Sequence, residues 1–374
     1  MENTRRISEY FADVETYKEH NGYFCSVQEA LTLVLLGSFC GLRSVKMIHE
    51  WAKTPSIIDF LREEFGIINI PCYYWLLCLM KLITPESFNR CFMNWTQSLV
   101  PESLKGCTVS FDGKTIRSTG KMKSYKSPLH IVSAYIAELG ITFGQQAVYD
   151  KSNEIPAVQN LIKLLNLEGC MVVADALNCQ KGTAKAIIEG KADYLLNVKD
   201  NHSTLKQDIE DYVQSDDLRE NMDTFSTLEK NRERVERRTA FTTHSIDWLY
   251  GKEEWESMVC IGAIRRQFTT LEGMTDEWHY YISSRKLTAE DLLKHARSEW
   301  SVETMHWLLD VHFAEDYSRI KDDSANQNLN TIRKVALNYI RNYKNKTGSK
   351  LPISRLMFAC LLDCDKVAEI IGFQ

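Results

Sequence analysis

The sequence predicts an α/β fold, in which a mixed five-stranded sheet follows a helical amino-terminal region and precedes carboxyl-terminal helices. Three observations support this class. Apolar residues recur at helical spacing through residues 1 to about 100. Runs rich in β-branched residues begin at Cys107, and they alternate with further helical segments, as in folds that pack helices against a sheet. We therefore expect a helical domain over residues 1–100 and a second domain over residues 101–374.

The amino-terminal region is predicted to be a set of helices separated by prolines. Ser26 precedes the apolar run EALTLVLLGSFCGL, and its hydroxyl is suited to accept a hydrogen bond from the first turn of a helix. Pro55, Pro71 and Pro85 punctuate the helices that follow, because proline fits the start of a helix better than its interior.

Five β-type runs account for the predicted sheet, and helical segments separate the later ones. The runs lie at residues 107–112, 130–137, 141–149, 170–175 and 192–198. Helical spacing occurs at residues 153–165, 180–190 and 203–213. A hairpin that passes into β-α-β units gives a mixed sheet with helices against it.

The last third of the chain combines another β-rich stretch with helices. Residues from about 225 to 285 are rich in β-type runs, and helical spacing then extends from Thr288 to about Phe313. Two further helices are expected at roughly 324–345 and 352–371.

Composition limits the class of protein. The chain has 374 residues and a formal net charge of −5, which argues against a uniformly basic nucleic-acid binder. Basic residues nevertheless gather in three segments, at 114–126, 230–238 and 333–350. The amino terminus has no cleavable apolar segment, and the longest uncharged apolar stretch is shorter than the roughly 18 residues of a membrane helix. We expect a cytoplasmic protein with no membrane partner, and its eleven cysteines to be thiols.

Two acidic residues stand at the ends of predicted neighbouring strands. Asp112 ends the run CTVSFD and Asp175 ends the run CMVVAD. The predicted strand order places these strands side by side, which brings both carboxylates to one edge of the sheet. Two familiar motifs do not fit here: a P-loop needs glycine at position 108, which is threonine, and a D-x-D motif needs an acid at Lys114.

A third acid is expected on the helix before residue 313. Glu299, Glu303 and Asp310 are spaced so that they share roughly one face of this helix, and the spacing does not choose among them. Carboxylates that converge raise one another's pKa unless a cation is present, and Mg²⁺ prefers oxygen ligands. Two such ions can activate a water or hydroxyl and stabilise the leaving oxygen of a phosphoryl displacement. The acids therefore indicate a site that cuts phosphodiester bonds.

Several ordered motifs resemble those of one known family. They are FDGKTIR, HIVSAY, KSNEI, VVADALNCQKG, ADYLLNVKDN, the run from Arg234 to Arg238, and WSVETMHWLLDVHFAED. Together with the leading segment LLGSFCGLRSVKMIHEWA, they resemble the H-repeat-associated transposases, which are DDE enzymes of bacterial insertion sequences. The resemblance covers nearly the whole chain. It implies a ribonuclease-H-like core that is interrupted by a β-rich insertion at about residues 225–285.

The resemblance also implies residue roles and partners. It selects Glu303 as the third acid, so that Asp112, Asp175 and Glu303 would hold two Mg²⁺ ions, which Mn²⁺ can replace. It implies cleavage of double-stranded DNA at element ends, joining of the 3′-hydroxyl to target DNA, and a homodimer on that DNA. The amino-terminal helices would read the element ends. Basic residues near the motifs are the expected phosphate contacts: Lys114, Arg117, Lys199, Arg234 and Arg238.

Two other functions are compatible with the sequence. The chain could be a catalytically idle descendant that only binds DNA, or a metal-dependent nuclease that cuts DNA without joining it. Cleavage and strand-transfer assays distinguish these three functions.

Overall fold

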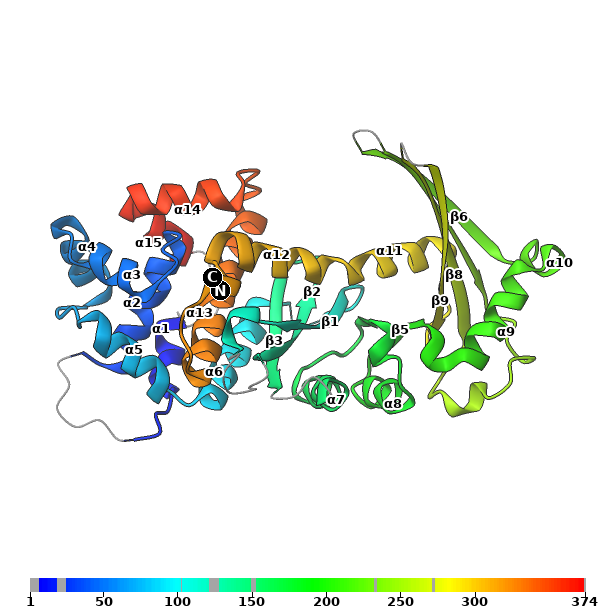
Figure 1. Ribbon diagram of the computed structural model, residues 1–374, viewed down its shortest axis with the longest axis horizontal. Helices are drawn as coiled ribbons and strands as arrows, with labels where there is room; N and C mark the ends of the chain where they lie inside the picture. Colours follow the sequence, from blue (N-terminus) through cyan, green and yellow to red (C-terminus); the bar gives the residue numbers. More distant parts are fainter. Residues whose placement is uncertain are drawn as a thin grey trace. The chain divides into compact units, whose positions relative to one another are not determined.

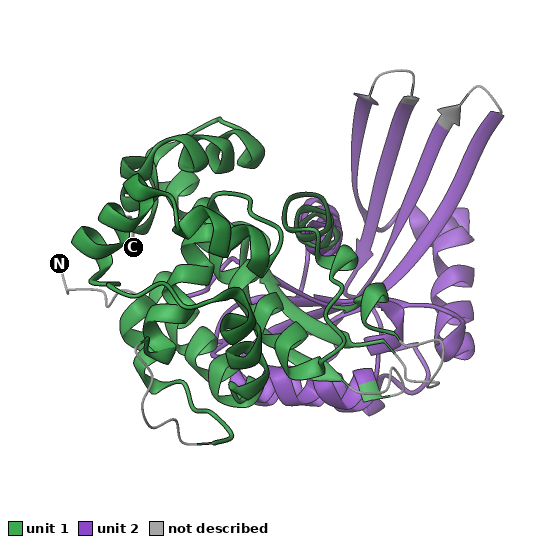
Figure 2. Ribbon diagram, turned by 60° about the vertical axis from the view of Figure 1, so that its left-hand side comes forward, with its two compact units in different colours: residues 1–101, 113–153, 303–374 green, residues 102–112, 154–302 purple. Residues whose placement is uncertain are grey.

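The computed structural model describes residues 7–18, 25–101, 103–120, 128–148, 153–231, 234–270 and 273–372, except for the side chains of residues 231, 234, 269 and 270. The chain forms two compact units (Figure 2). Unit 1 comprises Met1–Pro101, Gly113–Asn153 and Glu303–Gln374, and unit 2 comprises Glu102–Asp112 and Glu154–Val302. Each unit therefore combines segments that are distant in the sequence.

Unit 1 is largely helical and is built around one long helix. That helix, α13 (Asp323–Thr347), packs against three helices of the amino-terminal region and against a strand. The other helices in the described part of this unit are α1 (Ile7–Tyr10), α2 (Val27–Phe39), α3 (Val45–Ala52), α4 (Pro55–Phe65), α5 (Tyr73–Leu82), α6 (Pro85–Leu99), nearly all of α12 (Ser301–Phe313), α14 (Ile353–Leu362) and α15 (Cys364–Gly372) (Figure 1). Ser26 caps α2 as expected, and its hydroxyl accepts a hydrogen bond from the Glu29 amide at 3.1 Å. The helical prediction for this region is confirmed.

The strands form one sheet of nine, with the order β3-β2-β1-β4-β5-β9-β8-β7-β6. Their bounds are β1 (Thr108–Thr115), β2 (His130–Ile136), β3 (Ile141–Val148), β4 (Met171–Ala174), β5 (Asp193–Val198), β6 (Asp223–Asn231), β7 (Arg234–Thr243), β8 (Cys260–Thr270) and β9 (Gly273–Ser283). Strands β1, β4 and β5 pair in parallel. The pairs β5–β9, β9–β8, β8–β7 and β7–β6 are antiparallel. The mixed α/β class is confirmed, but the sheet is larger than the five strands predicted.

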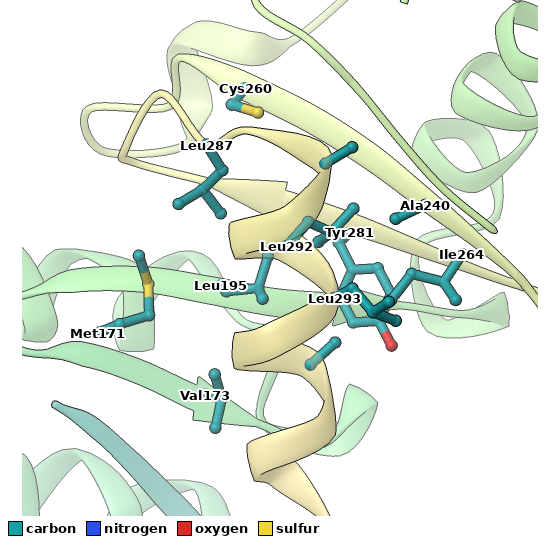
Figure 3. Close-up of a cluster of buried hydrophobic side chains, with 12 residues drawn as sticks. Met171, Val173, Leu195, Ala240, Cys260, Ile264, Tyr281, Leu287, Leu292 and Leu293 are labelled. Atoms are coloured by element: carbon teal, nitrogen blue, oxygen red, sulfur yellow. The ribbon is translucent and has the colours of Figure 1, made fainter. Parts of the chain in front are cut away.

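Four further helices of unit 2 accompany the strands: α7 (Glu154–Leu164), α8 (Lys181–Glu189), α9 (Ser203–Gln214) and α10 (Asp216–Arg219). A fifth, α11 (Ala289–Glu299), packs on the sheet (Figure 3). Its Leu292 and Leu293 lie among Val173, Leu195 and Tyr281 of three strands, all of them buried. This apolar cluster fixes β4 against the helix, and β4 leads directly into the candidate site.

Three details differ from the expectations. Strand β1 continues to Thr115, so Asp112 lies within a strand and does not end it. The helix expected from Thr288 to Phe313 is two helices, α11 and α12 (Ser301–Phe313), which meet at Trp300. The last predicted helix is also two, α14 and α15. The spacing of apolar residues continues across both breaks, so periodicity alone does not reveal them.

Candidate functional site

Asp112 and Asp175 occupy matching positions at the point where two neighbouring strands of unit 2 stop pairing. The parallel pairing of β1 with β4 ends where Phe111 lies opposite Ala174. Asp112 follows Phe111 within β1, and Asp175 follows Ala174, the last residue of β4. The prediction that these strands are neighbours is confirmed, and both acids follow the end of the same ladder.

Asp175 is held in place by the short helix that it caps, Ala176–Asn178. Its carboxylate accepts hydrogen bonds from the Asn178 backbone amide at 3.2 Å and from the Asn178 side-chain Nδ2 at 2.9 Å. Burial raises the pKa of Asp175, and the charges of Glu154 and Asp112 raise it further against the effect of the Asn178 hydrogen bonds. Asp175 has no ion-pair partner among the described residues.

The short helix after Asp175 is held in place by residues that follow the neighbouring strand, β5. Beyond β5, the Asn201 side chain donates a hydrogen bond to the Ala176 carbonyl at 2.8 Å. His202 Nε2 lies 2.7 Å from the Cys179 carbonyl, and its ring packs edge-on against Trp255 with centroids 5.1 Å apart. These contacts limit the movement of Asp175, because the first residue of the short helix and the residue that follows this helix both bind side chains of the segment after β5.

Two residues of this site were not identified from the sequence. Asn178 is fully buried and donates Nδ2 to both Asp175 and Glu154, the latter at 3.2 Å. Glu154 begins α7 and is only 4% exposed. The signal that could have found Asn178 is the Asp-x-x-Asn spacing, in which an aspartate caps a turn through the residue three positions later.

The third-acid candidates have different surroundings. Glu303 lies in the first turn of α12 in unit 1 with its side chain exposed, whereas Glu299 ends α11 in unit 2. Asp310, also on α12, accepts a hydrogen bond from Lys114 Nζ at 2.5 Å. Since the helix is interrupted at Trp300, Glu299 lies on a different helix from Glu303 and Asp310.

Lys114 is an internal residue of unit 1. Its side chain is 14% exposed, and its ammonium also forms an ion pair with the buried Glu315 at 2.7 Å. Burial alone would lower the pKa of Lys114, but Glu315 and Asp310 raise it. Its role in phosphate contact stays a prediction, and in this structure its charge is paired with two acids of the same unit.

The other predicted phosphate contacts differ from one another in how exposed their side chains are. Arg238, 9% exposed, is ion-paired with Glu229 at 3.0 Å and with Glu236 at 2.6 Å, so it is also internal. Arg117 and Lys199 are exposed. The fifth expected contact, Arg234, begins β7, and its side chain lies outside the described residues. Residues 121–127, which carry much of the first basic segment, also lie outside them.

Carboxylate oxygens of the kind that Asp112 and Asp175 offer are ligands preferred by hard divalent ions. Within the described residues, no three His, Cys, Asp or Glu side chains gather closely enough to hold a metal ion. All eleven cysteines are free thiols. No helix in the described part of the chain has the length and apolarity needed to cross a membrane.

Comparison with known proteins matches this chain to transposases. A family profile described as Transposase DDE domain matches residues 103–339, and a DDE_Tnp_1-associated profile matches residues 8–96. YncI of Escherichia coli O157:H7, named as a transposase, is 34% identical over 86% of this chain and 85% of its own. YhhI of Escherichia coli K12, named as an H repeat-associated transposase, is 27% identical, and YbfL of the same strain is 28% identical; each comparison covers 98% of both chains.

Among solved structures, a piggyBac transposase synaptic complex with hairpin DNA aligns with 98% of this chain and 77% of its own, at a TM-score of 0.45 and 9% identity. That likeness is too weak to support an argument about fold or function. The family assignment depends on the sequence profiles and the curated relatives. This chain belongs to the H repeat-associated DDE transposase family.

Proposed function

We propose that this transposase cuts phosphodiester bonds at the ends of an insertion sequence and joins the freed 3′-hydroxyl to target DNA. The observation that carries this proposal is the pairing of β1 with β4, which sets Asp112 and Asp175 at the end of one parallel ladder. The charge of Asp112 contributes to the raised pKa of Asp175. A buried acid whose ionisation a neighbouring acid disfavours is one that a bound cation stabilises.

We propose two Mg²⁺ ions as the cofactor, with Mn²⁺ as a substitute, and Glu303 as the third acid. The exposed carboxylate of Glu303 is unlike that of Asp310, which Lys114 already neutralises. Bound divalent ions would lower the pKa of a water and stabilise the leaving oxygen. Asp112 and Asp175 would bind them from β1 and from the cap after β4, and Asn178 would orient the Asp175 carboxylate.

We propose that Arg117 and Lys199, together with Arg234, contact the phosphates of double-stranded DNA. Arg117 and Lys199 are exposed, in contrast to Lys114 and Arg238. Each phosphate contact should weaken with salt, because DNA binding releases condensed counterions. We further propose that the protein acts as a homodimer on DNA in the bacterial cytoplasm.

The test uses a supercoiled plasmid that carries the chain's own gene with its genomic flanks, incubated with the full-length protein and Mg²⁺. The expected result is cleavage at the element ends, followed by 3′-end joining to a second duplex. Asp112→Asn and Glu303→Gln should each reduce both reactions by about 1000-fold, as expected from losing several kcal/mol of transition-state stabilisation. Glu299→Gln, the matched control, should retain activity.

Three results would contradict the proposal. Equal products from the wild type and Asp112→Asn would indicate a protein that binds DNA without cutting it. Cleavage without joining would indicate a nuclease. A loss of activity in Glu299→Gln, with Glu303→Gln unaffected, would assign the third acid to the other helix.

A further inference from the structure

Unit 1 contains a cavity of about 630 Å³ that is separate from the acids described above. It is lined by side chains of α2, α3, α5 and α13 and by the segment between α12 and α13. Aliphatic residues, including Val34, Leu77 and Leu329, are the largest group in the lining. Its volume lies within the range of about 300–1,000 Å³ that is typical of small-ligand sites.

Arg333 lines this cavity, and no residue in the described part of the chain is a hydrogen-bond or ion-pair partner of its guanidinium. It lies on α13 and is only 9% exposed. The described residues provide no hydrogen bond or ion pair to its side chain, although Glu315 and Asp310 act on it electrostatically. Burial lowers the pKa of Arg333 against the effect of both acids. A buried arginine normally satisfies its five donors, since leaving them unpaired is costly.

The residue that follows shows that this arrangement is specific to Arg333. Lys334, also buried, donates hydrogen bonds to Ser133 Oγ at 2.8 Å and to Gln145 Oε1 at 2.7 Å. The fold thus provides acceptors for one buried cation on α13 and leaves its neighbour facing a cavity. A ligand that carries acceptor oxygens would satisfy Arg333.

The rest of the lining favours an anion that is attached to a flat apolar group. Arg43, Lys46 and Arg319 add three exposed cations, and the described lining includes no acidic residue. Arg43 uses one donor on the Val311 carbonyl at 3.2 Å. Tyr73 and Tyr317, 42% and 79% exposed, supply aromatic faces. Aromatic rings and basic groups together are how proteins bind nucleotides outside a duplex.

We propose that this cavity binds a nucleotide, with its phosphate on Arg333 and its base among the aliphatic and tyrosine side chains. Such a nucleotide can be free in solution or part of a single-stranded DNA segment. Both sources present the same chemistry, and the experiment separates them. This site needs none of the proposed catalytic acids.

The test measures binding to the full-length protein in EDTA, so that metal-dependent reactions cannot contribute. The probes are dAMP, a short single-stranded oligodeoxynucleotide and inorganic phosphate, and the readouts are calorimetry and thermal unfolding. The variants are Arg333→Met, the rim variant Arg319→Gln, and Arg355→Met as a control on an exposed arginine of α14.

The wild type and Arg355→Met should bind dAMP or the oligonucleotide and unfold at a higher temperature with it. Arg333→Met should weaken binding by about 10- to 100-fold, as expected for losing charge-assisted hydrogen bonds. Its melting temperature without ligand should be unchanged or higher, because an unpaired buried charge is removed. Arg319→Gln should fold normally and bind more weakly than the wild type.

Binding of dAMP would identify a free nucleotide, and binding of the oligonucleotide alone would identify a DNA strand; either supports the proposal. The proposal is overturned if neither probe binds, if inorganic phosphate binds as tightly as dAMP, or if Arg333→Met binds as tightly as the wild type. Because Asp112→Asn should bind these probes normally, failure of the nucleotide site is distinguishable from failure of the proposed catalytic site.

Discussion

Two acids, Glu315 of unit 1 and Asp175 of unit 2, are stabilised in opposite ways. In unit 1, the carboxylate of Glu315 is ion-paired with Lys114 at 2.7 Å and accepts a hydrogen bond from Asn330. In unit 2, the carboxylate of Asp175 receives only the neutral donors of Asn178. Glu315 is the more deeply buried of the two residues, yet it has the compensating cation.

The pKa shifts of these two acids express the same difference. Burial alone would raise the pKa of Glu315, but Lys114 reverses that effect and the pKa is lowered. Burial raises the pKa of Asp175, and the Asn178 hydrogen bonds do not reverse it. An acid that already has its cation contributes to the fold, whereas an acid that lacks one remains available to bind a cation.

The largest expected effect is on stability, and it follows from removing the charge of Glu315, the buried acid that is paired with Lys114. Glu315→Gln should lower the free energy of unfolding at pH 7 by about 3–5 kcal/mol, because three buried cations, Lys114, Arg333 and Lys334, lose the negative charge that favours their ionised forms. Equilibrium denaturation by urea measures this change. Since the folded-state pKa of Glu315 is lowered, its contribution is present above the ordinary glutamate pKa and is lost as the pH falls through the lowered value.

The control for that variant is an ion pair at the surface. Lys185 and Glu189 lie 3.9 Å apart with side chains 65% and 57% exposed. Lys185→Met should change the free energy of unfolding by less than about 0.5 kcal/mol. Equal losses in the two variants would mean that Lys114 and Glu315 are no more important than a surface pair.

The second prediction concerns Asp175, the acid that has no ion-pair partner among the described residues. Mg²⁺ at a hundredfold excess over its Kd should stabilise the wild type by about 2.7 kcal/mol. Asp175→Asn should lose this response and, without metal, be at least as stable as the wild type at pH 7. The raised pKa of Asp175 means that its ionised form costs stability as the pH rises through the folded-state value. Thermal unfolding with and without Mg²⁺ tests both parts, and an unchanged Mg²⁺ response in the variant would contradict them.

Sequence patterns predicted the strand order near the acids but not the full sheet. The pattern of a hairpin followed by a helix was enough to make β1 and β4 neighbours: β2 and β3 lie on one side of β1, and the chain returns through α7 so that β4 pairs on the other side. The same patterns did not indicate where the later β-rich stretch would pair. The structure places Ser283 opposite Leu195, so β9 continues the sheet beyond β5 and four strands join it. Pairing between distant segments depends on packing that local periodicity does not record.

The charges show a similar limit. The sequence identifies Lys114 as basic, but its partners are about 200 positions away, at Asp310 and Glu315. Whether a lysine is exposed or internal therefore depends on the tertiary fold. Asn178 is different, since its spacing from Asp175 is local and could have been recognised.

The third prediction converts the neutral donor of unit 2 into an acid. Asn178→Asp keeps the shape of the side chain but replaces the Nδ2 donor between Asp175 and Glu154 with a carboxyl group. At pH 7 the variant should lose about 1–3 kcal/mol of unfolding free energy, because the Nδ2 donor is lost and a third carboxyl group is placed beside those of Asp175 and Glu154. Acidification should reduce the deficit, since a protonated carboxyl can donate. Denaturation at pH 7 and pH 5 measures both values, and a deficit that does not depend on pH would exclude a charge effect.

The smallest predicted effect comes from Lys334, a buried lysine of unit 1 whose ammonium donates hydrogen bonds to uncharged acceptors. Burial lowers its pKa to about 7, and Glu315 only partly opposes that shift. Above this value the folded protein releases a proton that the unfolded chain keeps up to its ordinary lysine pKa, so stability rises with pH. The wild type should therefore gain about 1 kcal/mol relative to Lys334→Met between pH 7 and pH 8. Loss of the Ser133 and Gln145 hydrogen bonds lowers the stability of the variant at both pH values, so the difference between the two slopes isolates the titration. Parallel slopes would show that Lys334 keeps its proton, and that the cluster around Glu315 compensates this charge as well.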